Sequence, residues 1–227
     1  MKLSIIVPTF NEEKAIPALA KSIKRIEAEN FDYEIIIADG SSEDRTIGLV
    51  TDLGWQVVHA RRGRGTQMNQ GAQASTGQAL LFLHADTHLP PGAIRQIENA
   101  LANSAIIGGN FSLLFSGSSR EARWLTRIYP YLRLGGMCYG DSGFFIRREV
   151  FEAVSGFRDY PIFEDCDLYR RMRSHGRFVR LEGRATTSSR RFEGRFFSTL
   201  ALWIFLQVLY WLGVSPQRLG DLYRARR

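Results

Sequence analysis

The chain has 227 residues, which is enough for one sizeable domain. Hydrophobic residues make up 44% of it and charged residues 23%, proportions that exclude a disordered chain. The net charge is +7, and lysine supplies only Lys2, Lys14, Lys21 and Lys24 of the 30 basic residues, so arginine dominates. Because the arginine fork matches phosphates and carboxylates, this excess suits a nucleotide, an anionic membrane surface or nucleic acid as the ligand.

The two cysteines, Cys138 and Cys166, belong to no CxxC pair, which argues against a zinc knuckle or a redox motif. Two free thiols suit a reducing compartment. Residues 1–8 begin a strand at once and contain no signal-peptide core. We therefore expect a cytoplasmic protein, placed at the inner face of the membrane if its C-terminal segment meets lipid.

The first half of the chain alternates apolar runs with amphipathic stretches. We expect strands over residues 3–7, 34–38, 56–60 and 79–82. We expect Asn11 to cap a helix that begins at Glu12, Ser41 and Asp44 to form a capping box for a second helix, and a third helix from Met68 to Ala74. Strands separated by helices predict right-handed βαβ units and a largely parallel sheet, so the expected fold class is α/β.

The second half is more mixed. We expect strands over residues 106–115, 143–146 and 177–181, and helices over residues 120–132, 148–154 and 165–174. The sequence contains no internal repeat and no interdomain linker. We therefore expect one domain over residues 1–195, followed by a C-terminal helical extension over residues 196–227.

Residues 199–214 of this extension form a nearly continuous apolar run that is too short to span a bilayer as a helix. Arginines flank the run on both sides, and Trp203, Tyr210 and Trp211 are of residue types that favour a headgroup interface. Three placements stay open: a helix lying on a membrane, a contact between two copies of the chain, and a helix packed on the protein's own core.

Polar residues follow each of the first four strands. Thr9 and Asn11 follow the first, Asp39 the second, residues 61–65 the third and Asp86 the fourth. Because ligands of open α/β sheets bind at the carboxyl ends of the strands, we expect these residues to form one site. Asp86 suits a divalent cation that holds a phosphate, and Asp39 can accept a hydrogen bond from the ring N–H of a base. Neither GxGxxG nor GxxxxGK[ST] is present, which excludes the usual dinucleotide and Walker-type loops.

Five segments carry a resemblance to a known family. Residues 4–13 read SIIVPTFNEE, residues 39–44 DGSSED, residues 63–72 GRGTQMNQGA, residues 84–86 HAD and residues 163–171 FEDCDLYRR. In this order they resemble the motifs of family 2 glycosyltransferases, which have the GT-A fold, with HAD at the DxD position. The resemblance runs from Leu3 to about Leu181, and the chain is also similar to a compact bacterial subgroup linked with arsenosugar biosynthesis.

The resemblance implies transfer of a sugar from a nucleoside diphosphate sugar, with a UDP-sugar favoured, to an unknown hydroxyl acceptor. It implies that Asp165 is the base that deprotonates this hydroxyl and that Asp86 coordinates Mg²⁺ or Mn²⁺. One carboxylate base without an enzyme nucleophile implies inversion at the anomeric carbon. The donor-binding residues that it implies are Pro8, Thr9, Asn11, Glu12, Asp39, Gly63, Arg64, Asn69, His84, Ala85 and Asp86.

Four more residues are expected on the acceptor side or in support of the site: Asp141, Glu164, Arg190 and Arg191. Residues 183–194 are rich in Ser, Thr and Arg, and we expect them to form a lid that brings Arg190 or Arg191 to phosphate. Asp167 stands four residues before Arg171, a spacing that predicts a structural ion pair within a helix.

The chain departs from the family pattern at two points. His84 replaces the first aspartate of DxD, and the QxxRW motif of processive synthases is absent, which argues against a processive polymerase. Two other functions stay open. His84, Asp86 and His88 could form the zinc triad of a hydrolase, and the arginines could belong to a non-catalytic module that binds anionic surfaces. The arginines form no single stripe with interleaved aromatic residues, so we expect no nucleic-acid partner.

Overall fold

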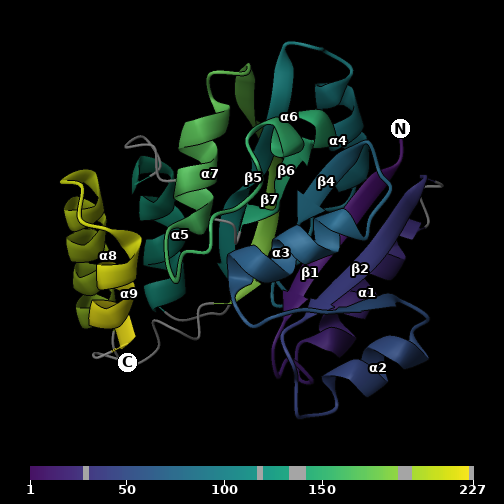
Figure 1. The fold of residues 1–227 in the computed structure, drawn as a ribbon, viewed down its shortest axis with the longest axis horizontal. Helices are drawn as coiled ribbons and strands as arrows, with labels where there is room; N and C mark the ends of the chain where they lie inside the picture. Colours follow the sequence, from purple (N-terminus) through teal and green to yellow (C-terminus); the bar gives the residue numbers. More distant parts are fainter. Residues whose placement is uncertain (28–30, 117–119, 133–141, 189–195, 225–227) are drawn as a thin grey trace.

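The computed structural model describes residues 1–27, 31–116, 120–132, 142–188 and 196–224. A seven-stranded sheet with the order β3-β2-β1-β4-β6-β5-β7 lies at its centre (Figure 1). The strands are β1 (Leu3–Thr9), β2 (Tyr33–Asp39), β3 (Gln56–His59), β4 (Ala79–Phe82), β5 (Ile106–Ser116), β6 (Phe144–Arg147) and β7 (Arg177–Ser188). Among these strands β6 alone runs antiparallel to its neighbours, and the other pairings are parallel.

Helices cover both faces of the sheet (Figure 1). The helices that precede the C-terminal extension are α1 (Ile16–Glu27), α2 (Thr46–Asp52), α3 (Arg64–Gln73), α4 (Ala93–Leu101), α5 (Arg120–Leu132), α6 (Arg148–Ala153) and α7 (Glu164–Met172). Side chains alternate along a strand, so Leu3 and Ile5 of β1 face a core shared with α1, α2, α4 and α5. Ile6 lies in the opposite core, with α3, α6 and α7. The molecule is therefore a three-layer α/β/α structure.

Helix α3 packs unusually close to the sheet. A Cβ atom on Gly71 would lie 2.5 Å from Cγ2 of Ile6 in β1, which is closer than real Cβ atoms approach a neighbour. The absence of a side chain at residue 71 therefore lets α3 rest against β1. The beginning of α3, which carries the GRG segment, is held at the end of this strand.

The expected fold class and the largely parallel sheet are confirmed, and each expected strand is present. The last strand is longer than expected, because β7 continues past residue 181 to Ser188. The structure has a helix that the sequence pattern does not predict, α4 over residues 93–101, between two strands. Helix α3 begins at Arg64, four residues earlier than predicted.

Both predicted N-terminal caps are wrong. Helix α1 begins at Ile16 instead of Glu12, and Asn11 has a φ of +54°, with its side-chain oxygen accepting a hydrogen bond from the backbone of Glu43. Ser41 has a φ of +68°, and α2 begins only at Thr46. The amide and the side-chain oxygen of Asn11 instead bind the loop after β2, a tertiary use that local cap patterns do not reveal.

The C-terminal extension forms a helical hairpin of α8 (Phe196–Trp211) and α9 (Pro216–Arg224), at the left in Figure 1. Its inner face joins a small apolar cluster with the segment before α7, including Ile162, Phe163, Leu206 and Leu219. The expectation that this segment packs on the protein's own core is confirmed for the inner face.

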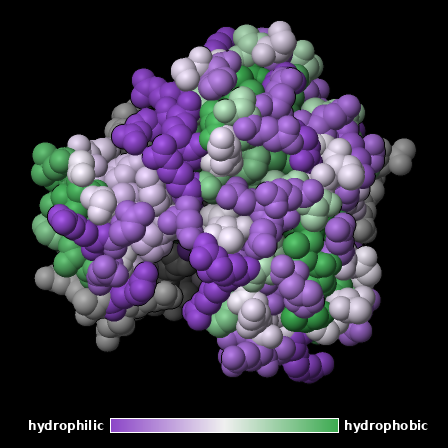
Figure 2. Space-filling model, viewed as in Figure 1, coloured by the Kyte–Doolittle hydropathy of each residue, from purple (hydrophilic) through white to green (hydrophobic). Residues whose placement is uncertain are grey.

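The outer face of α8 is apolar and exposed. Its exposed large hydrophobic residues are Phe197, Ile204, Phe205, Val208 and Trp211, and the exposed Leu212 follows directly after the helix. In Figure 2 hydrophobic colour gathers at this edge of the molecule. No helix within the described ranges is long and apolar enough to cross a bilayer. Contact of the outer face with a membrane or with a second copy stays a prediction.

A polar cluster joins the amino ends of β1, β2 and β4, opposite the ends where ligands are expected. One carboxylate oxygen of Glu34 accepts hydrogen bonds from the Ser4 hydroxyl at 2.7 Å and the Thr76 backbone at 2.6 Å. The other oxygen lies 3.1 Å from the ammonium of Lys2. Partial burial raises the pKa of Glu34, but these hydrogen bonds outweigh that effect and lower the pKa to about 2.

This cluster predicts an acid-sensitive contribution to stability. Because the folded-state pKa of Glu34 is depressed, its contribution is complete above the unfolded-state pKa near 4.5 and is lost as the pH falls towards 2. We expect Glu34→Gln to lower the free energy of unfolding by about 1–3 kcal/mol at pH 7 and by much less at pH 3. Urea unfolding at both pH values checks this, with the exposed Glu182→Gln as the control. A loss of equal size at both pH values would contradict it.

Candidate active site

The carboxyl ends of the parallel strands meet along one edge of the sheet, which we call the ligand edge. Strand β1 ends at Thr9 and β2 at Asp39, and these two residues are register partners. Strand β6 runs in the opposite direction, so its first residue, Phe144, pairs with Phe82 at the end of β4. Figure 2 shows the surface hollowed between the α8–α9 hairpin and the body of the molecule, with hydrophilic side chains on the rim.

Asp39 is fully buried at this edge and is bound by its own neighbours. Its Oδ1 accepts hydrogen bonds from the hydroxyls of Thr9 at 2.8 Å and Ser42 at 2.6 Å, and its Oδ2 accepts one from the Ser42 backbone at 2.8 Å. The carboxylate therefore fixes the end of β1 relative to the turn after β2. Pro8, which precedes Thr9 within β1, is half-buried.

The first two motifs are bound to each other through their backbones. The amide of Asn11 donates to the Ser42 hydroxyl at 2.8 Å, and the side-chain oxygen of Asn11 accepts from the Glu43 amide at 2.9 Å. The amide of Glu12 donates to the hydroxyl of Thr46 at 2.8 Å. The structure thus brings together the predicted residues Thr9, Asn11, Glu12 and Asp39, in one hydrogen-bonded unit.

Gln67 connects this unit to the GRG segment. Its buried amide nitrogen donates to the carbonyl oxygens of Thr9 at 2.7 Å and Ala38 at 2.8 Å. Its amide oxygen accepts from the backbone of Gly63 at 3.3 Å. The sequence reasoning missed Gln67, although it lies in the third motif. Its position could have indicated this role. Gln67 lies one helical turn after Gly63 and one turn before Gly71, so it is on the helix face that packs against β1.

Arg64 extends the connection to the acidic motif. Its guanidinium lies 3.1 Å from the carboxylate of Glu164, which is only 2% exposed, so the charge of Glu164 is paired where water is scarce. A Cβ on Gly65 would come within 2.8 Å of the Arg158 carbonyl oxygen. The starts of α3 and α7 therefore touch at the ligand edge, and Asp165 is the residue after Glu164.

Two other arginines of the same loop also have partners. Arg61 forms an ion pair with Asp159, and the guanidinium carbon of Arg62 lies 3.8 Å from the centre of the Phe10 ring. The Arg62–Phe10 pair spans the loops after β1 and β3, and no sequence motif predicted it.

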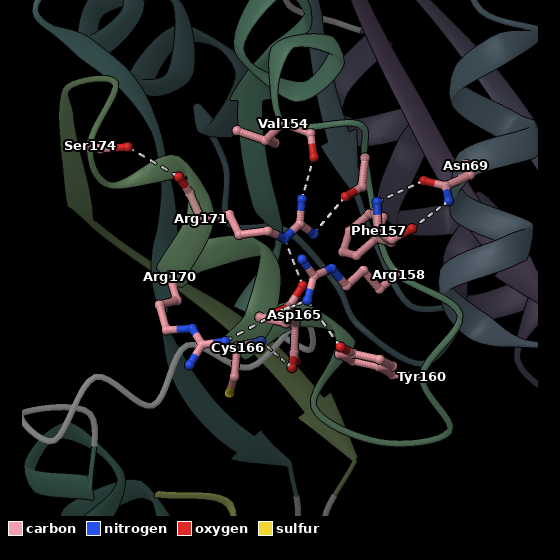
Figure 3. Close-up of polar contacts among 12 residues, drawn as sticks. Asn69, Val154, Phe157, Arg158, Tyr160, Asp165, Cys166, Arg170, Arg171 and Ser174 are labelled. Atoms are coloured by element: carbon pink, nitrogen blue, oxygen red, sulfur yellow. Dashed lines mark hydrogen bonds and ion pairs between the residues drawn. The ribbon is translucent and has the colours of Figure 1, made fainter. Parts of the chain in front are cut away.

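Asn69 was expected to bind the donor, but in the structure its amide binds the backbone of Phe157 at both ends (Figure 3). The nitrogen donates to the Phe157 carbonyl at 2.8 Å, and the oxygen accepts from the Phe157 amide at 2.9 Å. Asn69 thus joins α3 to the loop that leads into α7.

The HAD segment follows β4 and is joined to the end of β7. The backbones of His88 and Thr186 exchange two hydrogen bonds of 2.8 Å, forming an isolated bridge. Burial lowers the pKa of the His88 ring, against the opposing charge of Asp86. No three His, Cys, Asp or Glu side chains within the described ranges gather as a metal-binding group, so the predicted zinc triad of His84, Asp86 and His88 is wrong.

The HAD segment is better suited to a cation that binds one protein carboxylate and takes its other ligands from phosphate and water. Asp86 is half-exposed, and its carboxylate has no hydrogen bond or ion pair within the described part of the chain, whereas the adjacent Ala85 is buried. Mg²⁺ is commonly held by one or two carboxylates, with phosphate oxygens and water completing its shell. The single carboxylate of Asp86 fits this arrangement.

Asp165 lies in the first turn of α7 and is 7% exposed, and its Oδ1 accepts a hydrogen bond from the Cys166 amide at 2.7 Å. Asp165 lies on the helix whose first turn Arg64 joins to the ligand edge, and its role as the base stays a prediction.

Asp167, two residues further, has a different role. It is fully buried and pairs with three guanidinium groups, those of Arg171 at 2.7 Å, Arg158 at 3.5 Å and Arg170 at 3.7 Å. These three arginines are labelled in Figure 3. Arg171 also donates to the backbone carbonyls of Val154 and Gly156. The predicted structural ion pair is confirmed, within a larger network than the sequence indicated.

Asp141, Arg190 and Arg191 lie outside the described residues, so their expected roles stay predictions. The expected lid is wrong for its first half, because Gly183 and the residues up to Ser188 belong to β7, and residues 184–188 pair with β5.

The position of Gln67 predicts a specific cost of removing its amide. We expect Gln67→Leu to lower the free energy of unfolding by about 1–3 kcal/mol, because two buried carbonyl oxygens lose their donor. Chemical denaturation checks this, and Gln73→Leu, at an exposed position of the same helix, is the matched control. Equal stability of the two variants would show that the Gln67 hydrogen bonds do not hold the strand ends.

The comparison with protein families gives one clear match. Residues 4–155, about two thirds of the chain, match the model of "Glycosyl transferase family 2". This range contains the first four motifs and ends before the acidic motif at residues 163–171.

Curated relatives are distant but cover much of the chain. A probable glycosyltransferase, YdaM of Bacillus subtilis, is 23% identical over 82% of this chain and 50% of its own length. A beta-monoglucosyldiacylglycerol synthase of Nostoc is 26% identical over 75% of this chain and 41% of its own length. The chain thus spans about half the length of the curated relatives it matches.

Solved structures share the fold. The mannosyltransferase PcManGT from Pyrobaculum calidifontis, in complex with GDP-Man and Mn²⁺, aligns with a TM-score of 0.67 at 20% identity, over 88% of this chain and 59% of that chain. TarS 1–349 of S. aureus, in complex with UDP-GlcNAc, aligns with a TM-score of 0.65 at 18% identity, over 87% of this chain and 61% of that chain. These likenesses confirm the GT-A fold, and with the family match over most of the sheet they establish that the chain belongs to glycosyl transferase family 2.

Proposed function

We propose that this protein transfers a sugar from a nucleoside diphosphate sugar to an acceptor hydroxyl, with inversion at the anomeric carbon. The observation that carries the proposal is the Arg64–Glu164 ion pair, which joins the GRG segment to the helix that bears Asp165. A phosphate-compatible loop and a carboxylate base are thus adjacent at the ligand edge. The relatives named as glycosyltransferases and the neighbours solved with GDP-Man or UDP-GlcNAc support the same reaction class.

The nucleoside side of the donor is proposed to lie over the unit of Thr9, Asn11, Glu12 and Asp39. In the described state Asp39 is fully buried beneath Ser42, so the ring N–H of a base reaches its carboxylate only when the turn at residues 41–42 shifts. Oδ2 accepts a single hydrogen bond and keeps an acceptor position for this contact. Uracil presents a suitable ring N–H, so we favour a UDP-sugar.

The diphosphate is proposed to lie between the GRG segment and the HAD segment. Backbone amides near Gly63 and the guanidinium of Arg64 supply donors and positive charge, and the neighbouring His84 and Ala85 line the approach to Asp86. Asp86 would hold Mg²⁺ or Mn²⁺, which, when bound, offsets the negative charge of the leaving nucleoside diphosphate.

The chemical step is a single displacement. Asp165 takes the proton of the acceptor hydroxyl, and the acceptor oxygen forms a bond to the anomeric carbon while the bond from that carbon to the diphosphate oxygen breaks. The proton ends on Asp165, and the electron pair leaves with the nucleoside diphosphate. Because one bond forms on the face opposite the one that breaks, the configuration inverts. Glu164 fixes the first turn of α7 through Arg64.

The role of Asp165 is tested by replacing its carboxylate with an amide of the same shape. We expect Asp165→Asn to lower turnover about 100–10,000-fold, because the general base is lost, while nucleotide affinity stays unchanged. Turnover is measured as release of nucleoside diphosphate from UDP-GlcNAc or GDP-mannose with Mn²⁺, with and without added acceptors, and affinity is measured by calorimetry with UDP and with GDP.

Asp167→Asn is the contrasting variant. Asp167 is buried and pairs with three arginines, so its amide variant is expected to lower the melting temperature, whereas Asp165→Asn leaves it nearly unchanged. Retention of wild-type turnover by Asp165→Asn would remove Asp165 from the mechanism.

The role of Asp86 is tested without turnover. In the wild-type protein we expect Mn²⁺ to tighten the binding of UDP, and in Asp86→Asn we expect Mn²⁺ to have little effect, because the cation loses its protein ligand. A thermal-shift titration of UDP, with and without Mn²⁺, measures this, since a ligand at 100 times its Kd adds about 2.7 kcal/mol of stability. Asp52→Asn, at an exposed position at the end of α2, is the control. An unchanged effect of Mn²⁺ on the Asp86 variant would place the cation elsewhere.

Three points stay predictions: the donor sugar, the acceptor and the likeness to the arsenosugar-linked subgroup. The titrations with UDP and GDP reduce the number of candidate donors. A cytoplasmic location at the inner face of a membrane is likewise part of the proposal, because it would bring the exposed stripe of α8 to lipid.

A further inference from the structure

Phe163, the residue before α7, has a backbone conformation that its side chain disfavours. Its φ is +65° and its ψ is +20°, in the left-handed region that bulky residues rarely adopt. A residue stays in such a conformation only where the surrounding packing determines it. The packing around Phe163 therefore decides where α7 begins.

That packing comes from the C-terminal hairpin. The Phe163 ring stacks on Tyr210 of α8, with centroids 4.7 Å apart and an interplanar angle of 23°, and meets Trp203 edge-on at 6.4 Å. The ring is 2% exposed and shares its cluster with Leu206 and Leu219. Residues about 40 to 60 positions later in the chain thus hold the conformation of Phe163.

A second contact holds the same segment from the side of α9. A Cβ on Gly220 would lie 2.4 Å from Cγ of Pro161, so α9 packs directly against the residue that lies two positions before Phe163. The segment from Pro161 to Phe163 is therefore enclosed by both helices of the hairpin.

Phe163 in turn sets the first turn of α7. Its carbonyl oxygen accepts a hydrogen bond from the Asp167 amide at 3.0 Å, and this turn contains Glu164 and Asp165. Rotation of the Phe163 backbone would change the position of Asp165 relative to the GRG segment, to which the adjacent Glu164 is joined by Arg64.

We propose that the α8–α9 hairpin positions the Asp165 base, and that Phe163, Trp203 and Tyr210 are the positioning residues through which it acts. These three residues act through the backbone of α7, and no contact with donor or acceptor is proposed for them. The inference rests on the proposed function, because it assigns the hairpin a part in the same reaction.

The ring of Tyr210 supplies this contact, and its hydroxyl does not. The hydroxyl is buried and has no hydrogen-bond partner within the described ranges, and burial raises the pKa of Tyr210 to about 12. Tyr210→Phe keeps the stacked ring and removes an unsatisfied polar atom. Tyr210→Ala removes the stack, so the two variants separate the ring from the hydroxyl.

The first measurement is hydrogen exchange of the unliganded full-length protein, which needs no donor. We expect Tyr210→Ala to speed the exchange of amides 164–168 on the order of tenfold or more, with exchange in β1 and β4 unchanged. Tyr210→Phe is expected to keep the wild-type protection. Phe205→Ala removes an aromatic ring from the exposed face of the same helix and is the matched control.

The second measurement is turnover of UDP-GlcNAc or GDP-mannose with Mn²⁺, whichever the wild-type protein consumes. We expect Tyr210→Ala to lower kcat on the order of tenfold with the donor KM unchanged, and Tyr210→Phe to restore kcat. In an Asp165→Asn background Tyr210→Ala is expected to lower kcat no further. The reason is that Tyr210→Ala acts on kcat only through the Asp165 carboxylate, which this background already lacks.

Unchanged exchange at residues 164–168 in Tyr210→Ala would overturn the inference, and so would faster exchange with wild-type kcat. A wild-type protein that binds no nucleoside diphosphate and consumes no donor would instead refute the proposed function. In that case the exchange data alone decide whether the hairpin fixes the start of α7.

Discussion

The ion pair between Arg64 and Glu164 is the contact on which the arrangement of this site depends. Glu164 is nearly inaccessible to water, and an unpaired carboxylate there would be strongly unfavourable, so the loop after β3 must bring its guanidinium to the start of α7. The ion pair thereby joins the part of the site built on β1, β2 and β3 to the start of α7, the helix that carries the acidic motif. Gly71 and Gln67 complete the constraint, because the glycine sets how close α3 lies to β1 and the glutamine fixes the strand ends below it.

Much of the fold could be predicted from the sequence, and the reason is physical. The apolar runs of β1, β2 and β4 are buried on both faces, so their hydrophobic signal is continuous and strong. The grouping of Thr9, Asp39 and Arg64 along one edge followed from the rule that parallel strands end together. The resemblance, and not periodicity, supplied the roles of Asp86 and Asp165.

What could not be predicted depends on distant partners. Asn11 has good cap chemistry, but its amide and its side-chain oxygen bind Ser42 and the Glu43 backbone in the neighbouring loop, and these tertiary contacts prevailed over a helix cap. Asn69 looked like a ligand residue because of its motif, yet its amide matches the backbone of Phe157, 88 positions away. The inner face of α8 could not be distinguished from its outer face, since the helix is apolar all round and carries no amphipathic signal.

The bridge between His88 and Thr186 bears on how relatives of this protein can be recombined. It pairs the segment that carries Asp86 with the end of β7, so the two halves of the chain are in register at that carboxylate. A chimera whose crossover lies between residues 88 and 186 takes the two paired segments from different relatives, so it must preserve this pairing. A slip of one residue would displace the segment by about 3.3 Å and turn its side chains to the opposite face. Crossover points after this bridge are therefore safer than those between the two residues it joins.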